Sequence, residues 1–116
     1  MTSDKPVRRS QADRRAETRA KLLEAARGLF IEMGFAETPT PEIVRKAGVT
    51  RGALYHHFAD KADLFRALVE EEAQAISVHI DRETRDVADP EQAMMIGSNA
   101  FFEAMLVQGR VRLLLE

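Results

Sequence analysis

The fold is decided by one stretch, Ala47-Gly48-Val49-Thr50-Arg51-Gly52-Ala53-Leu54-Tyr55-His56-His57-Phe58, which is followed closely by Lys61. It predicts a tight turn between two helices. Gly48 can adopt the left-handed backbone that commonly ends a helix. The hydroxyl of Thr50 can cap a new helix that begins at Arg51. Leu54 and Phe58 are four residues apart, so they are expected to share the buried side of this helix.

The opposite side of this helix carries groups that suit a nucleic acid. Arg51 can donate two hydrogen bonds to guanine or bind a phosphate. Gly52 has no side chain, so the free amides at the helix start can approach a phosphate closely. Tyr55 offers a flat ring and a hydroxyl. His56 and His57 lie near the helix C-terminus, where the helix dipole is expected to favour their charged forms.

Two more helices are predicted before this turn. The first, of roughly twenty residues, has apolar residues at helical spacing and a glycine at its end. These residues are Leu22, Ala26, Leu29, Met33 and Gly34. The second is short, with Thr40 as its cap, Pro41 in the first helical position and Glu42 in the first turn. Together the three helices predict a helix-turn-helix unit.

These segments also carry a family resemblance. The matching positions are Ala25, Ala26, Leu29, Phe30, Gly34, Phe35, Thr38, Ile43, the run 47–50, Gly52, Leu54, Tyr55, His57, Phe58, Lys61 and Leu64. The pattern, over about residues 16–76, resembles the TetR family of transcriptional regulators. Two positions depart from it: the family usually has a small hydroxyl residue at Pro39 and alanine at Val44.

The resemblance implies which residues meet DNA. The helix from Arg51 to Phe58 would enter the major groove. Contacts to bases or adjoining phosphates are implied at Arg51, Gly52, Tyr55 and His56. Contacts to the DNA backbone are implied at Thr40, Thr50, Tyr55, His57 and Lys61. Because of the departures at Pro39 and Val44, the contact at Thr40 is less firmly implied than those at Thr50 and Lys61.

The resemblance also implies an all-α organisation in three parts. Residues 1–15 form a flexible basic tail, residues 16–76 a three-helix helix-turn-helix DNA-binding domain, and residues 77–116 part of a regulatory domain. A long helix links the two domains and leads into the first helices of a TetR-type regulatory bundle. The family's usual partners are a palindromic DNA operator, a second copy of the chain in a homodimer, and a small-molecule effector.

The C-terminal half is predicted to be helical as well. An apolar stripe begins at Leu64 and continues toward Thr84, which predicts a long helix. The run Asp89-Pro90-Glu91 is typical of the start of another helix, and Val111 begins a sixth. Family members usually continue through several more helices, so the sequence is expected to be part of a longer regulator. If it were complete, apolar faces near Phe101 and Leu113 would be uncovered.

Other candidate sites are weaker. Met94, Met95, Phe101, Phe102 and Met105 could line an effector pocket, but core packing is the preferred interpretation. Glu70, Glu71 and Glu72 are interpreted as solvated charge on a helix. His56, His57 and Asp60 could suggest a metal site, yet adjacent histidines on a helix diverge and His79 is distant in sequence. We therefore predict no metal and no cofactor.

Composition sets the remaining bounds. The chain has 116 residues, of which 45% are hydrophobic and 31% charged, and no cysteine. It has neither a bilayer-length apolar run nor a signal-peptide core, so a soluble, cytoplasmic protein without membrane contact is expected. Basic and acidic residues number eight and four in residues 1–28, five and five in 29–69, and four and ten in 70–116. The net charge of -2 thus divides into a basic end that can face phosphates and an acidic end that faces away.

The sequence therefore predicts a DNA-binding transcriptional regulator, namely a ligand-responsive repressor that binds its operator as a dimer. Arg8, Arg9, Arg14 and Arg15 are either a solvated tail or a phosphate-contacting arm. Two alternative functions stay open. One is a helical protein-interaction module without operator binding, and the other is a small-ligand carrier or enzyme. No arrangement of serine, histidine and carboxylate rises above chance, so catalysis is not predicted.

Overall fold

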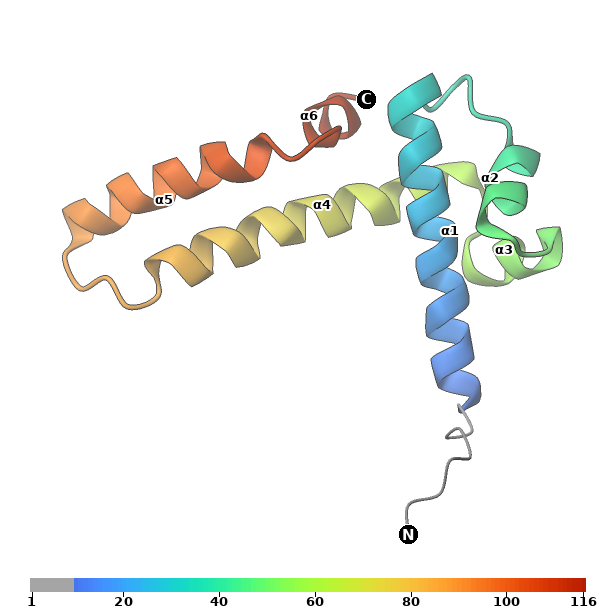
Figure 1. Ribbon diagram of the computed structural model, residues 1–116, viewed down its shortest axis with the longest axis horizontal. Coiled ribbons are helices and arrows are strands. Elements are labelled where there is room, and N and C mark those ends of the chain that lie inside the picture. The colour runs from blue at the N-terminus through green and yellow to red at the C-terminus, as the bar shows by residue number, and fades with distance from the viewer. Residues whose placement is uncertain (1–9) are drawn as a thin grey trace, which may run out of the picture.

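The computed structural model describes residues 10–116, and this part of the chain consists of helices joined by loops, without a strand. The helices are α1 (Gln11–Met33), α2 (Thr40–Ala47), α3 (Arg51–His57), α4 (Lys61–Thr84), α5 (Pro90–Met105) and α6 (Arg110–Leu114). In Figure 1, α1, α2 and α3 form one unit, and α4 crosses α1 and runs away from it. The predicted all-α fold is confirmed.

Helix α1 begins earlier than expected because Ser10 and Asp13 form a capping box. The Asp13 amide donates to the Ser10 hydroxyl at 3.0 Å, and the Ser10 amide donates to the Asp13 carboxylate at 3.3 Å. This reciprocal pair satisfies two amides that the helix start leaves free. The expected tail of residues 1–15 therefore ends sooner, and Arg14 and Arg15 belong to α1. Residues 1–9, with Arg8 and Arg9, lie outside the described part.

The start of α2 also differs from the prediction. Pro39, not Thr40, occupies the cap position, and no side chain caps the helix; Thr40 is its first helical residue. The preceding Thr38 is buried, and its hydroxyl donates to the Gly34 carbonyl at 2.6 Å. At the other end, Gly48 has a φ of 70° and a left-handed backbone, as predicted.

The turn between α2 and α3 and the start of α3 fold as the residue types predicted. The Thr50 hydroxyl accepts from the Ala53 amide at 3.0 Å and so caps α3. Leu54 and Phe58 are buried, with exposed fractions of 0% and 3%. Because these two side chains are held in the core, the other side of α3 faces outward.

One core joins the helix-turn-helix unit to α4 and α6. Its largest side chains include Phe30, Ile43, Leu54, Leu64 and Leu113. The rings of Phe30, Phe35 and Phe65 pack on one another with centroids 5.1 to 5.6 Å apart. Leu113 itself is fully buried, but its neighbours Val111 and Leu115 are exposed, so the expected uncovered apolar face lies beside Leu113 and does not include it. Met33, expected in the core stripe of α1, is exposed instead.

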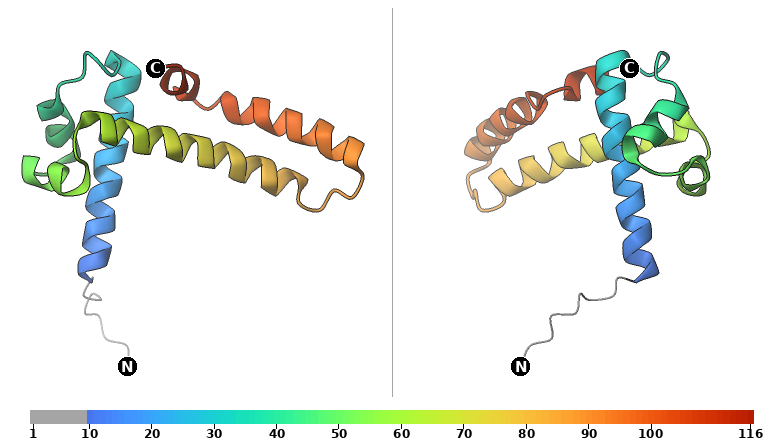
Figure 2. Two further views of the ribbon diagram at one scale, coloured as in Figure 1. Left: turned by 180° about the vertical axis from the view of Figure 1, so that it is seen from behind. Right: turned by 45° about the vertical axis from the view of Figure 1, so that its right-hand side comes forward.

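Helices α4 and α5 form an antiparallel hairpin that extends away from the other helices, as both views in Figure 2 show. Met94, Met95, Phe101 and Phe102 of α5 are exposed, with 65% of Phe102 accessible. The preferred interpretation of these residues as core packing is therefore wrong for the described chain. Of the helices in residues 10–116, none combines the length and apolar content that a bilayer crossing needs.

Candidate nucleic-acid interface

The outward side of α3 carries polar side chains that are exposed to solvent. Arg51, Gly52, Tyr55 and His56 are exposed, and 45% of Tyr55 is accessible. The guanidinium carbon of Arg51 lies 5.7 Å from the centroid of the Tyr55 ring, within the range of a cation-π contact. This contact restricts where Arg51 can point before any ligand arrives. The predicted inward and outward sides of α3 are thus both found in the structure.

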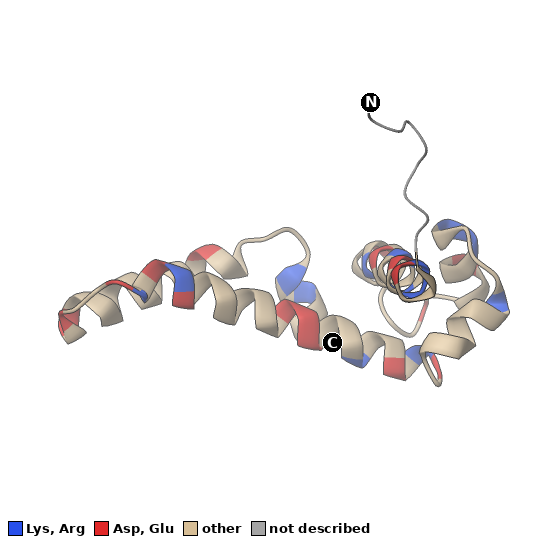
Figure 3. Ribbon diagram, turned by 90° about the horizontal axis from the view of Figure 1, so that it is seen from below, with Lys and Arg blue, Asp and Glu red and all other residues tan. Residues whose placement is uncertain are grey.

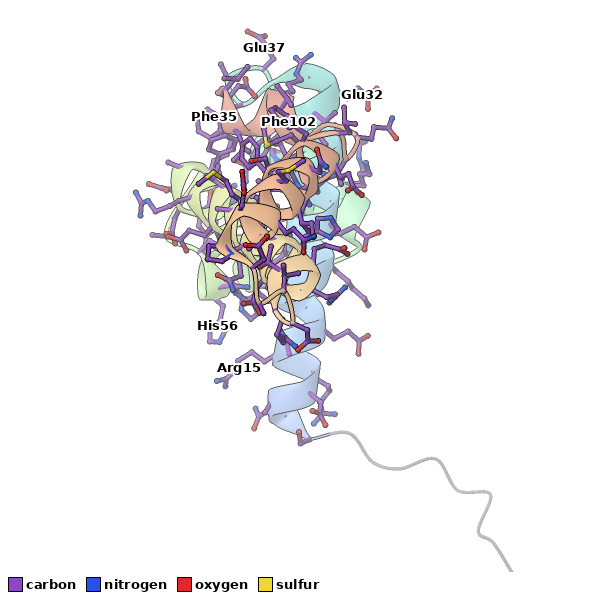
Figure 4. The ribbon with its side chains drawn as sticks, turned by 90° about the vertical axis from the view of Figure 1, so that its left-hand side faces the viewer. Arg15, Glu32, Phe35, Glu37, His56 and Phe102 are labelled. Atoms are coloured by element: carbon purple, nitrogen blue, oxygen red, sulfur yellow. The ribbon has the colours of Figure 1, made fainter. Side chains whose placement is uncertain are left out.

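A shallow groove of about 400 Å³ separates α3 from the start of α1. Its walls combine basic and hydrogen-bonding side chains from both helices: Gln11, Arg14, Arg15, Thr18, Ala53, His56 and His57. Figure 4 shows Arg15 and His56 on the same side of the molecule. The groove therefore adds Arg14 and Arg15 to the predicted surface. The spacing of Ser10 and Asp13 was the sequence signal that could have placed both arginines on a helix.

His57 differs electrostatically from the prediction. Burial is the main cause that lowers its pKa below 6.5, and the nearby positive groups His56, Arg19 and Arg15 lower it further. The helix dipole was expected to favour the charged form, but desolvation and like charge outweigh it here. Near neutral pH the ring is therefore mainly neutral. An anion in the groove would counteract the lowering of the His57 pKa that the neighbouring positive groups cause.

The predicted contacts of Thr50 and Gly52 with the DNA backbone depend on different local features. Thr50 is exposed, but its hydroxyl oxygen already accepts the Ala53 amide. A Cβ added at Gly52 would meet only the Thr50 hydroxyl oxygen within 4 Å, at 3.9 Å. The protein itself does not require glycine at this position. Because Gly52 has no side chain, the space in front of the α3 amides stays open.

Lys61 has a structural role that the sequence did not indicate. Its amine donates to the carbonyl of Phe35 at 2.7 Å and to that of Thr38 at 3.1 Å. The same nitrogen lies 4.4 Å from the centroid of the Phe35 ring. It therefore fastens the loop between α1 and α2 to the start of α4. An ammonium group has three donors, and the two carbonyls use two of them.

Residues 22–68 match the family model described as bacterial regulatory proteins of the tetR family. The chain belongs to the TetR family. The matched segment runs from the middle of α1 through α2 and α3 into α4. It therefore contains the contact residues that the family resemblance implied, from Thr40 to Lys61, but not Arg14 and Arg15.

Relatives extend the similarity beyond that segment. The chain is 37% identical over 108 residues to the HTH-type transcriptional regulator TtgR of Pseudomonas putida, which covers 91% of the chain and 50% of TtgR. It is 46% identical over 63 residues to the HTH-type transcriptional repressor BepR of Brucella suis, covering 54% of the chain and 30% of BepR. Half the length of TtgR thus has no counterpart in the 116 residues.

A solved structure agrees with the fold. The crystal structure of a TetR-family transcriptional regulator from Pectobacterium atrosepticum superimposes with a TM-score of 0.73 at 34% identity. The similarity covers 93% of the chain and 55% of that protein. The arrangement of α4 and α5 beside the TetR-type helix-turn-helix unit is thus shared with an experimental structure.

A buried ionic cluster lies away from the outward side of α3. Glu72 of α4 is only 6% exposed, although it was interpreted as solvated charge. Its two carboxylate oxygens accept from Arg27 of α1 at 2.5 Å and from Arg110 of α6 at 2.6 Å. Figure 3 shows an acidic segment of α4 beside a basic segment at the start of α6. The cluster joins three helices of this TetR-family chain, and the sequence offered no spacing signal for it.

The two arginines of this cluster also reach backbone carbonyls. Arg27 donates to the Gln108 carbonyl at 3.0 Å, and Arg110 donates to the Ala104 carbonyl at 2.5 Å. Burial raises the pKa of Glu72, but the hydrogen bonds and charges of Arg27 and Arg110 outweigh it, so the pKa lies below 4.5. The carboxylate therefore stays charged at neutral pH. Through Arg27, the cluster attaches the segment before α6 to α1.

Proposed function

We propose that this protein is a sequence-specific DNA-binding transcriptional regulator that inserts α3 into the major groove. The observation that carries the proposal is the division of α3 into two sides. Leu54 is locked into the core, while Arg51 and Tyr55 are exposed and in contact with each other. A helix supported in this way can present side chains to base edges while the adjoining helices contact the backbone. The transcriptional regulators among the relatives support the same function.

We further propose roles for the remaining contact residues. Gly52 and His56 adjoin the bases or nearby phosphates, and Thr40, Thr50, His57 and Lys61 contact the DNA backbone, together with Tyr55. Arg14 and Arg15 extend this surface along the groove beside α3. The contacts divide into those that position the protein and those that read sequence. Residues 16–76 form the DNA-binding domain in this proposal, and residues 77–116 belong to the regulatory domain.

Dimer formation and ligand response belong to the same proposal. The protein would act in the cytoplasm as a homodimer on a palindromic operator, with two copies of α3 in successive major grooves. Helix α4 runs unbroken for 24 residues from the helix-turn-helix unit to the hairpin with α5. An effector that favours one position of this helix would thereby change DNA affinity. The description of BepR as a repressor supports negative regulation.

Replacement of Arg51 by alanine is expected to weaken binding to the preferred operator by about 1–3 kcal/mol and to relax sequence preference. The measurement is a titration of labelled duplex followed by fluorescence anisotropy. Arg85→Ala is the matched control, because Arg85 is also exposed but lies at the far end of α4, where it pairs with Asp81. Equal effects of the two changes would contradict the assignment of Arg51.

Replacement of Gly52 by alanine is expected to have opposite effects on folding and on DNA binding. The helix should gain about 0.5–1 kcal/mol because alanine loses less backbone freedom, and the added Cβ meets no close protein atom. DNA binding should weaken because the Cβ fills the space in front of the α3 amides. Thermal unfolding and operator titration measure the two effects. A variant that is more stable and binds DNA as tightly would rule out a close phosphate contact at Gly52.

The salt dependence of binding separates this proposal from a protein-interaction module. Each phosphate contact that releases a counterion makes the slope of log affinity against log salt more negative by about 0.9. Because the proposed surface holds several basic residues, a steep slope is expected, and Arg15→Ala should reduce it by about one contact. A chain that binds duplex DNA with no salt dependence, or not at all, would favour the interaction module.

A further inference from the structure

A small apolar pocket lies between the start of α2 and the start of α3. Its volume is about 290 Å³, and its walls are formed by Thr40, Pro41, Val44 and Arg51. The lining is almost entirely apolar. Val44 closes the inner side, because it is half-buried and packs on the core, whereas Pro41 is exposed. The inner wall of the pocket is thus held in place by the core.

The position of the pocket relates it to DNA. Arg51 forms one wall and is at the same time in contact with the ring of Tyr55 on the outward side of α3. Where Arg51 meets a base edge, the pocket lies directly beside that contact. The occupant is therefore a group that the major groove presents next to the base read by Arg51. This step rests on the proposed function.

The chemistry of the pocket selects among such groups. Base edges in the major groove offer hydrogen-bond donors, hydrogen-bond acceptors and one apolar group, the C5 methyl of thymine. A donor or acceptor placed against Pro41 and Val44 would lose its water without gaining a partner, which is unfavourable. A methyl group gains from leaving water. The volume also has room for the ring edge that carries the methyl.

We propose that this pocket binds the C5 methyl group of a thymine adjacent to the base that Arg51 contacts, and that Pro41 and Val44 determine this preference. Burial of one methyl is worth about 0.8 kcal/mol, which corresponds to about fourfold in affinity. A palindromic operator with two half-sites has two such thymines. Removal of both methyl groups is then expected to weaken binding by about fifteenfold if the two contacts add.

The test uses uracil, which differs from thymine only by lacking this methyl. Duplexes selected by the full chain from a random pool are resynthesised with each dT replaced singly by dU, and their affinities are measured. We expect one position in each half-site, next to the base that Arg51→Ala ceases to distinguish, to lose about fourfold. Equal affinities for dT and dU at all positions would overturn the proposal.

Variants of the pocket complete the experiment. Val44→Ala should bring the ratio of dT to dU affinities at that position close to one, and Pro41→Ala should lower it. Val78→Ala, a substitution of an exposed valine on α4, should leave the ratio unchanged. Because each ratio compares two duplexes on one protein, a loss of folded protein cancels. An unchanged ratio in Val44→Ala would overturn the role of the pocket, and failure to select any duplex would overturn the proposed function itself.

Discussion

Replacement of Glu72 by alanine is expected to lower the free energy of unfolding by about 3–5 kcal/mol, because it leaves a buried guanidinium without its counter-ion. The side chain of Arg110 is 9% exposed and has no other carboxylate partner among the described ion pairs. Since small domains have a total stability of about 5–15 kcal/mol, this one change removes a large share. Urea unfolding monitored by circular dichroism measures it.

The neighbouring Glu71 provides a matched control for this change. It lies on the same helix but is exposed, and its separation from Arg19 is 3.9 Å. Exposed pairs of this kind contribute little, so Glu71→Ala should change stability by no more than about 0.5 kcal/mol. Similar losses for the two variants would show that the buried cluster is not what holds α1, α4 and α6 together.

The same carboxylate predicts a dependence of stability on pH. Its folded pKa lies below the ordinary 4.5, so the unfolded chain binds the proton more tightly than the folded chain. The stabilising contribution is therefore complete above about pH 4.5 and is lost as the pH falls through the folded pKa. Between pH 5 and more acidic conditions, Glu72→Ala should lose less stability than the wild type, because the variant lacks the carboxylate whose pKa folding lowers. The difference should be about in proportion to that lowering of the pKa.

Replacement of Phe30 by alanine is expected to cost about 3–5 kcal/mol through lost burial and a residual cavity. Phe30 is fully buried, and its ring contacts both Phe35 and Phe65, with centroids 5.6 and 5.5 Å away. These contacts join α1 to the following loop and to α4. The loss should appear as a lower midpoint in urea unfolding with little change in slope.

Phe102 is the appropriate comparison, because the chemical change is the same and only the surroundings differ. It is 65% exposed on α5, and its ring contact is with the neighbouring Phe101. Phe102→Ala should therefore change stability by about 0.5 kcal/mol or less. A large loss at Phe102 together with a small one at Phe30 would contradict the position of the core.

Local chemistry explains why the turn around Gly48 and Thr50 was predictable. A left-handed glycine, a hydroxyl cap and apolar residues four apart act within a few residues, so the sequence contains all the partners. The start of α1 is equally local, since Ser10 and Asp13 are three residues apart, yet the helix was predicted to begin later. At α2 the proline at position 39 took the cap position that Thr40 was expected to occupy.

The long-range polar contacts were not predictable in the same way. Glu72 is 45 residues from Arg27 and 38 from Arg110 along the chain, and its two acidic neighbours have the same appearance in sequence. Only the packing of α6 against α1 and α4 determines which of the three is buried. For the same reason the attachment of Lys61 to the loop carbonyls at Phe35 and Thr38 appeared only in the structure.

The charges of the interface are compatible with an acidic chain. The cationic residues that line the groove beside α3 come from the basic segment, residues 1–28, while the acidic excess lies in residues 70–116. Segregation of this kind lets one face attract phosphates although the total charge is negative. Because the pKa of His57 is lowered, its neutral ring adds no further positive charge beside Arg15 and Arg19 before DNA is present.

Selection of duplexes from a random pool, carried out in parallel with the wild-type chain and with Arg51→Ala, tests the central claim most directly. The account predicts that the wild type enriches a palindromic sequence and that Arg51→Ala loses preference at one base pair in each half-site while keeping the others. Enrichment of no sequence by the wild type, or of the same sequence with the same preferences by both proteins, would contradict the claim that the outward side of α3 reads DNA.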